Sequence, residues 1–109
     1  MPTVRIKEAL AGQPAIGTEI TVRGWVRTRR DSKAGFSFIN VHDGSCFDAI
    51  QVVAPAELDN YESEVKRLFP GSSVVVSGRL VASQGAGQAV EVQASSIRVL
   101  GFCEPMDYP

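Results

Sequence analysis

The chain has 109 residues, of which 44% are hydrophobic and 21% charged, and its formal net charge is -1. This length accommodates one hydrophobic core, so we expect a single domain over residues 1–103. No apolar run reaches the length of a membrane span, the N-terminus has no secretory signal pattern, and the net charge argues against general attraction to duplex DNA. With two distant cysteines and one histidine, we expect no metal site, and a cytoplasmic location with both thiols reduced.

The first elements expected are a short helix and a long strand. Residues 4–11 follow a helical pattern, with Thr3 as the N-cap and Gly12 at the end. Residues 19–30 alternate between apolar and polar side chains, which predicts a strand. Gly24 within it predicts a bulge or a sharp bend that lets the next residue change faces.

Further strands and a second helix follow. The turn "DGS" separates strands expected over residues 36–42 and 46–54. In residues 57–69 the apolar side chains recur at helical spacing, which predicts a helix that ends at "PG". Strands are expected over residues 73–82 and 89–100, joined by the flexible loop "SQGAGQ".

Three strands, a helix and two more strands is the element order of an OB-fold, a five-stranded barrel. The fold class predicted is therefore all-β with one or two short helices, one of them between the third and fourth strands. An SH3-like barrel or another α+β domain is the alternative. Residues 104–109, with two prolines in the tail, are expected to begin a linker.

Alternation along the strands sorts side chains into an inner and an outer face. Ile39 and Val41 are assigned to the core, which turns Phe36, Phe38 and Asn40 outward. On the other strands, the inward set is Ile50, Val52, Val90 and Val92, and the outward set is Ala49, Gln51, Val53, Glu91 and Gln93.

The outer face carries groups suited to single-stranded RNA or DNA. An exposed ring stacks an unpaired base. A glutamine amide offers one donor and one acceptor to a base edge, and a carboxylate accepts two hydrogen bonds, as guanine can provide. Five of the eleven basic residues lie between Arg23 and Lys33, where they can neutralise phosphates without reading sequence.

Other interpretations of these residues stay open. A slip in register would place Phe36 or Phe38 in the core, and the arginines can serve to protect a strand edge. Trp25 is expected to pack in the barrel, and a Cys–His catalytic pair near His42 is less plausible than a turn. Two alternative functions are a general single-stranded nucleic-acid binder and a protein-interaction domain that uses Phe36, Trp25 and the helix of residues 57–69.

The segments "VRGWVRTRRDSKAGFSFINVHDGSCFDAIQVV" and "GQAVEVQAS" resemble the N-terminal anticodon-binding domain of class IIb aminoacyl-tRNA synthetases. The resemblance covers residues 4–109. The form "GWVRTRRDSKAG" with "DGSC" is more similar to asparaginyl-tRNA synthetase than to the aspartyl or lysyl members.

The resemblance implies roles for individual residues. Phe38 would stack on the middle anticodon base, a uridine, and Gln51 would hydrogen-bond the same base. Glu91 would accept from the first base, a guanine, and Arg30 would lie beside the anticodon. The side chains expected to bind phosphates are those of Arg30, Arg29, Arg27 and Lys33.

The resemblance also implies the partners. The RNA would be asparagine tRNA, whose anticodon is GUU, and its third base has no assigned reader, with the loops around Lys33 and Gly85 as candidates. No catalytic residue or cofactor is expected in this chain, because ATP and magnesium belong to a catalytic domain that would follow the linker. We expect the chain alone to be monomeric and not to bind membranes.

Overall fold

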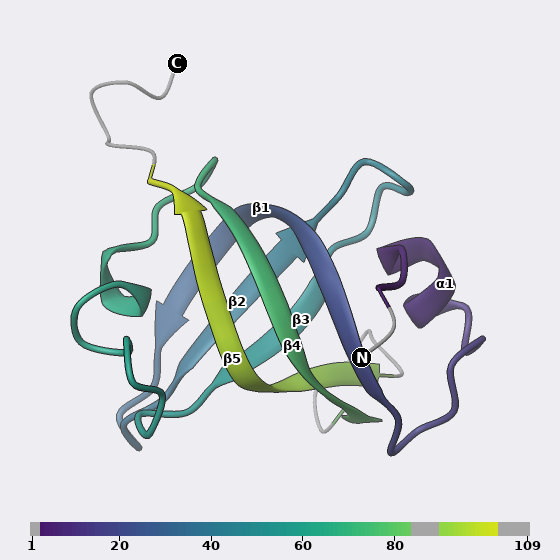
Figure 1. Ribbon diagram of the computed structural model, residues 1–109, viewed down its shortest axis with the longest axis horizontal. Coiled ribbons are helices and arrows are strands. Elements are labelled where there is room, and N and C mark those ends of the chain that lie inside the picture. The colour runs from purple at the N-terminus through teal and green to yellow at the C-terminus, as the bar shows by residue number, and fades with distance from the viewer. Residues whose placement is uncertain (1–2, 84–89, 103–109) are drawn as a thin grey trace.

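The computed structural model describes residues 3–83 and 90–102, and its strands close into a barrel (Figure 1). The strands are β1 (Glu19–Asp31), β2 (Ser37–His42), β3 (Ile50–Ala54), β4 (Ser73–Ala82) and β5 (Val90–Gly101). Their order is β1-β2-β3-β5-β4, and β1 also pairs with β4, which closes the barrel. The pairing of β3 with β5 is parallel, whereas the other four pairings of these strands are antiparallel. The predicted five-stranded OB-fold is confirmed.

Alternate side chains of every strand fill the barrel. The predicted inward residues are confirmed, with exposed fractions of 5% or less: Ile39, Val41, Ile50, Val52, Val90 and Val92. Ala49 was assigned to the outer face of the third strand, but β3 begins at Ile50 rather than at residue 46. Ala49 therefore lies before the strand, where the alternation does not apply, and its exposed fraction is 7%.

The long strand β1 keeps its alternation through Gly24. Val22 and Val26 are both buried, and Trp25 between them is 44% exposed, with its ring 5.9 Å from that of His42. The predictions that Trp25 packs in the barrel, and that a bulge at Gly24 lets it change faces, are therefore wrong. The register shifts between Val26 and Thr28 instead. Gly24 is needed for another reason, because a Cβ atom there would lie 2.2 Å from the carbonyl oxygen of His42.

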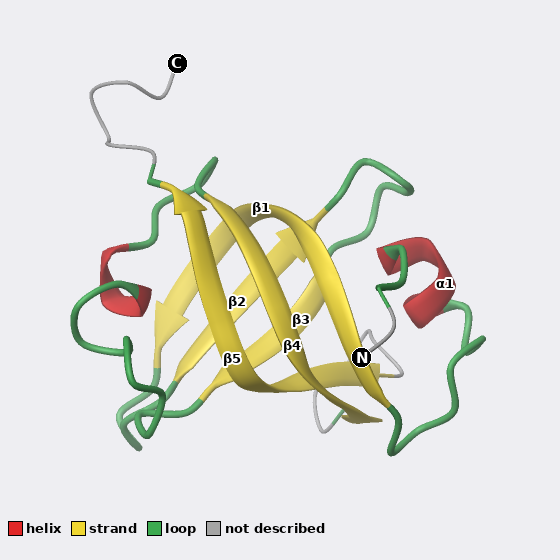
Figure 2. Cartoon of the chain, in the orientation of Figure 1, coloured by secondary structure: helices red, strands yellow, loops and turns green. Residues whose placement is uncertain are grey.

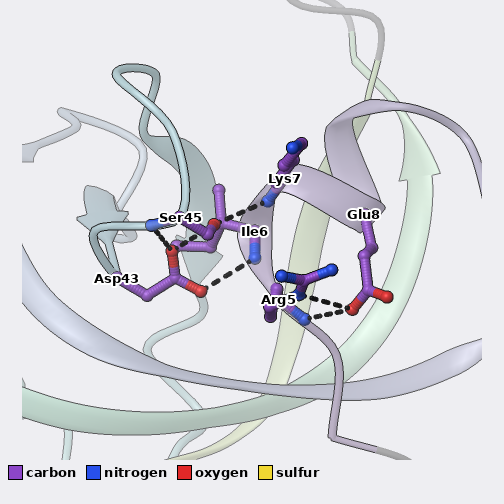
Figure 3. A network of polar contacts seen from close by, with 6 residues as sticks. All are labelled: Arg5, Ile6, Lys7, Glu8, Asp43 and Ser45. Atoms are coloured by element: carbon purple, nitrogen blue, oxygen red, sulfur yellow. Dashed lines mark hydrogen bonds and ion pairs between the residues drawn. The ribbon is translucent and has the colours of Figure 1, made fainter.

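The helix α1 (Ile6–Leu10) covers one end of the barrel (Figure 1). It is shorter than predicted, and its N-cap position is Arg5 rather than Thr3, which pairs with Thr21 in an isolated bridge. The turn between β2 and β3 caps the helix instead (Figure 3). The amide of Ile6 donates to Asp43 Oδ2 over 2.9 Å, and the amide of Lys7 donates to Ser45 Oγ over 3.1 Å.

The segment between β3 and β4 is not the predicted helix. It consists of turns and one short 3-10 helix, η1 (Val65–Arg67), at the opposite end of the barrel from α1 (Figures 1 and 2). Its amides bond to carbonyls three, four and five residues back, so no regular α-helix forms. Of the apolar side chains at helical spacing, Tyr61, Val65 and Leu68 are buried, whereas Phe69 is 40% exposed.

Some sequence predictions fall on residues that the structure does not describe. These are most of the loop "SQGAGQ" and the linker of residues 104–109. Among the described residues, no helix is long and apolar enough to cross a membrane.

Candidate nucleic-acid interface

Strand register aligns the outward side chains in two neighbouring rows that run across the strands. One row consists of Arg30, Phe38, Val53 and Gln93, and it continues to Arg79 on β4. The other row consists of Thr28, Asn40, Gln51 and Glu91. Residues paired across adjacent strands lie on the same face. The two rows therefore bring predicted site residues from four strands together on the outside of the barrel.

These rows form a groove of about 480 Å³, here called the Phe38 groove. It is lined by Arg30, Phe36, Phe38, Gln51, Val53, Glu91 and Gln93. The three residues for which the resemblance implies base contacts, Phe38, Gln51 and Glu91, are in this set together with Arg30. The outward orientation predicted for Phe36 and Phe38 is confirmed, so the slipped register that would bury them in the core is not observed.

The aromatic part of the groove is a pair of rings with a cation beside them. Phe36 meets Phe38 edge to face, with ring centroids 5.1 Å apart. The guanidinium carbon of Arg30 lies 4.9 Å from the Phe38 centroid. Such a cation–π contact at an exposed site contributes about 0.5–1 kcal/mol. A base stacked on an exposed ring contributes about 1–3 kcal/mol, which is more than this contact.

The polar part of the groove is an amide held by a carboxylate. Gln51 Nε2 donates to Glu91 Oε1 over 3.2 Å. Although Glu91 points to the outer face as predicted, only 7% of its surface is exposed. A carboxylate only accepts hydrogen bonds, so the amide nitrogen of Gln51 must face it. The amide oxygen of Gln51 is thereby directed away from Glu91.

The other predicted basic residues lie outside this groove. Arg29 Nε donates to the carbonyl of Leu68 over 3.0 Å, and its Nη1 pairs with Asp31 Oδ1 at 2.6 Å. Arg27 donates to the carbonyl of Phe47 over 2.8 Å. Lys33 is exposed in the loop between β1 and β2. Arg29 thus fastens β1 to the segment before β4, which is a structural task that the sequence did not indicate.

Hydrogen bonds fix the start of this loop. Ser37 is fully buried, and its hydroxyl donates to Asp31 over 2.6 Å and contacts the Tyr61 hydroxyl at 2.8 Å. The hydrogen bonds that Arg29 and Ser37 donate hold the pKa of the Asp31 carboxyl below its ordinary value of 3.8. Asp31 is therefore ionised at neutral pH and holds the end of β1 in place beside Arg30.

Sequence reasoning missed one charged residue of the same face. Arg79 on β4 lies opposite Gln93 on β5, and it lines a second cavity that adjoins the groove. The alternation of β4 places it outward, which is a signal that the sequence does contain. In the described parts of the chain, no three His, Cys, Asp or Glu residues are grouped as a metal site would require.

Comparison with known proteins identifies the family. Residues 20–100 match the model of the tRNA anticodon family, described as an OB-fold nucleic acid binding domain. The whole chain is 61% identical to part of the asparagine–tRNA ligase of Myxococcus xanthus, of which it spans 24%.

Solved structures of asparaginyl-tRNA synthetases contain a similar fold. The enzyme of Entamoeba histolytica in complex with asparaginyl-adenylate superimposes with a TM-score of 0.75 at 26% identity, over 98% of this chain and 25% of that one. For the enzyme of Pyrococcus horikoshii the TM-score is 0.78 at 21% identity, over 97% of this chain and 23% of that one. This chain belongs to the tRNA anticodon family of OB-fold nucleic acid binding domains, and within it resembles the domain of asparaginyl-tRNA synthetases.

Proposed function

We propose that the Phe38 groove binds the GUU anticodon of asparagine tRNA, and that the chain acts as the anticodon-binding part of an asparagine–tRNA ligase. The observation that carries this proposal is the contact of Gln51 with Glu91 beside the Phe38 ring. It places an oriented amide next to a surface for stacking. The family match and the 61% identity to a ligase support the same partner.

The middle base is expected to stack on Phe38 while its edge meets Gln51. Uracil carries a donor at N3, whereas cytosine carries an acceptor at the same position. The amide oxygen of Gln51, directed away from Glu91, accepts from uracil N3 and repels cytosine N3. Glu91 thus acts as a positioning residue for the middle base, in addition to its own contact with the first base.

The first base is expected to be guanine, with its two adjacent donors directed at the Glu91 carboxylate. Burial of an ionised carboxylate is costly unless hydrogen bonds compensate it. A guanine edge supplies two such bonds, while bases without paired donors would leave the charge poorly solvated. Arg30, displaced from the ring, is then available to a phosphate of the bound strand.

The chain spans 22–24% of the length of asparagine–tRNA ligases that it matches. We propose that the ATP-dependent and magnesium-dependent ligation belongs to the rest of such a protein, and that this chain supplies tRNA affinity alone. A contact at the anticodon adds to the contact at the acceptor end by raising the effective concentration of the second. We also propose that the isolated chain is monomeric and cytoplasmic.

The test is a titration of the chain with anticodon stem-loops at two salt concentrations. Loops with GUU and with GAU differ only at the middle base. We expect a preference for GUU that persists at the higher salt, because base contacts depend less on salt than phosphate contacts do. Equal affinities that fall together with salt would instead favour the general single-stranded binder, and no binding would favour the protein-interaction domain.

A further inference from the structure

A second cavity continues the Phe38 groove around the barrel. This Arg79 cavity has a volume of about 580 Å³ and shares three lining residues with the groove, namely Phe36, Val53 and Gln93. Its far wall is formed by Arg79 on β4 and Glu19 at the start of β1. A strand of nucleic acid that leaves the groove on this side would enter the cavity directly.

The order of strands gives the bound RNA a direction. Under the proposed function, the middle base lies at Phe38 and Gln51, on β2 and β3, and the first base lies at Glu91 on β5. A move toward the 5′ end of the RNA is thus a move from β3 to β5. The next strand in the barrel is β4, where Arg79 lies opposite Gln93 of β5.

We propose that the Arg79 cavity holds the nucleotide immediately 5′ of the anticodon, with Arg79 bound to the phosphate that joins this nucleotide to the first anticodon base. This inference rests on the proposed function, because the assignment of bases to strands sets the direction. The exposed Gln93 side chain and the Phe36 ring supply a polar and an apolar wall for the base.

The present partner of Arg79 is easily replaced. Its Nε lies 4.0 Å from Glu19 Oε1, and the side chains are 61% and 45% exposed. Exposed ion pairs of this kind contribute little. A phosphate offers shorter, charge-assisted and bidentate hydrogen bonds to a guanidinium, so it would displace the Glu19 carboxylate.

The first test compares Arg79→Gln with Arg98→Gln, an equal loss of charge at an exposed residue of β5 that lines a separate hollow. We expect Arg79→Gln to lower affinity for the GUU stem-loop about three- to tenfold at low salt. The slope of log K against log salt should fall by about 0.7, the value for one single-strand phosphate. Glu19→Gln should raise affinity, because a competing carboxylate is removed. If Arg79→Gln behaves like Arg98→Gln, the inference is wrong.

The second test locates the phosphate. A stem-loop with a neutral methylphosphonate at the linkage 5′ of the first anticodon base should bind wild type more weakly, and Arg79→Gln should then cause no further loss. Independent losses from the two changes would overturn the assignment. If the two changes are not additive but wild type binds GUU and GAU loops equally, the phosphate contact of Arg79 stands and the proposed recognition of the bases is refuted. If wild type binds no stem-loop, both the phosphate contact and the proposed function are refuted.

Discussion

Replacement of Glu91 by glutamine tests how the groove would distinguish uridine from cytidine at the middle base. In the wild-type chain Gln51 donates to the Glu91 carboxylate over 3.2 Å, where 7% of Glu91 is exposed. A hydrogen bond to a charged partner contributes about 1.5–3 kcal/mol. The reversed amide would lose this bond and place its oxygen against the carboxylate, so the observed orientation is favoured by about tenfold to a hundredfold.

In Glu91→Gln the new amide both donates and accepts, so either orientation of Gln51 finds a partner. We therefore expect the ratio of the Kd for a GCU stem-loop to that for a GUU stem-loop to fall about tenfold. Fluorescence anisotropy titrations of both loops measure it. Because both loops begin with guanine, any loss of contact to the first base cancels in the ratio.

The control for the Glu91 experiment is Glu62→Gln, which makes the same chemical change at a side chain that is 81% exposed. This variant should keep the wild-type ratio. Suppose that Glu91→Gln keeps the wild-type ratio of the two Kd values but weakens binding of both loops. Glu91 would then contact the first base without orienting Gln51. The proposed source of selectivity for uridine would then be refuted.

Three further changes have defined outcomes. Phe38→Ala should weaken binding of the GUU loop by about 1–3 kcal/mol through loss of stacking; wild-type affinity in the same titration would remove Phe38 from the site. Gly24→Ala should lower the free energy of unfolding in urea by about 1–3 kcal/mol, because its Cβ would lie 2.2 Å from the His42 carbonyl oxygen. Thr28→Ala on the same strand should lower it far less. Equal losses of stability in the two variants would contradict the close approach of Gly24 to His42. Burial raises the pKa of Asp43, but hydrogen bonds from the Ser45 hydroxyl and from the amides of Ile6 and Ser45 outweigh burial and hold that pKa below 3.8. The ionised Asp43 carboxylate therefore stabilises the folded chain fully above pH 3.8. This stabilisation is lost as pH falls through the lower folded-state pKa. Asp43→Asn should flatten the dependence of urea stability on pH in this acid range, and an unchanged acid profile would show that the charge of Asp43 contributes nothing to the cap of α1.

Much of the barrel could be predicted from the sequence because its strands alternate cleanly. The bounds of β4 match the prediction, β1 ends one residue later than predicted, and both bounds of β5, Val90–Gly101, are one residue later than the predicted 89–100. Alternation depends only on local spacing, so the inward and outward sets of β2 and β5 were correct as well. The outward placement of Phe38, Gln51 and Glu91 followed from the same alternation along their strands.

The errors arise where distant segments decide the local structure. The segment of residues 57–69 has helical spacing, yet Asn60 uses its side chain to bond the carbonyl of Ile97 and the carboxylate of Glu64. These contacts fix the segment against β5 and favour turns over a regular helix. In the same way, Asp43 caps α1 from 37 residues away, so a search for a local N-cap chose Thr3.

The bulge in β1 shows most directly why the site could not be completed from the sequence. Before the register shift between Val26 and Thr28, odd-numbered residues of β1 face outward, and after it even-numbered residues do. Without the shift, Arg29 would occupy the outer face and Arg30 the inner one. With it, Arg30 reaches the Phe38 ring and Arg29 bonds to Leu68. One irregularity in the pairing of β1 with β2 thus directs two consecutive arginines to opposite faces of the strand.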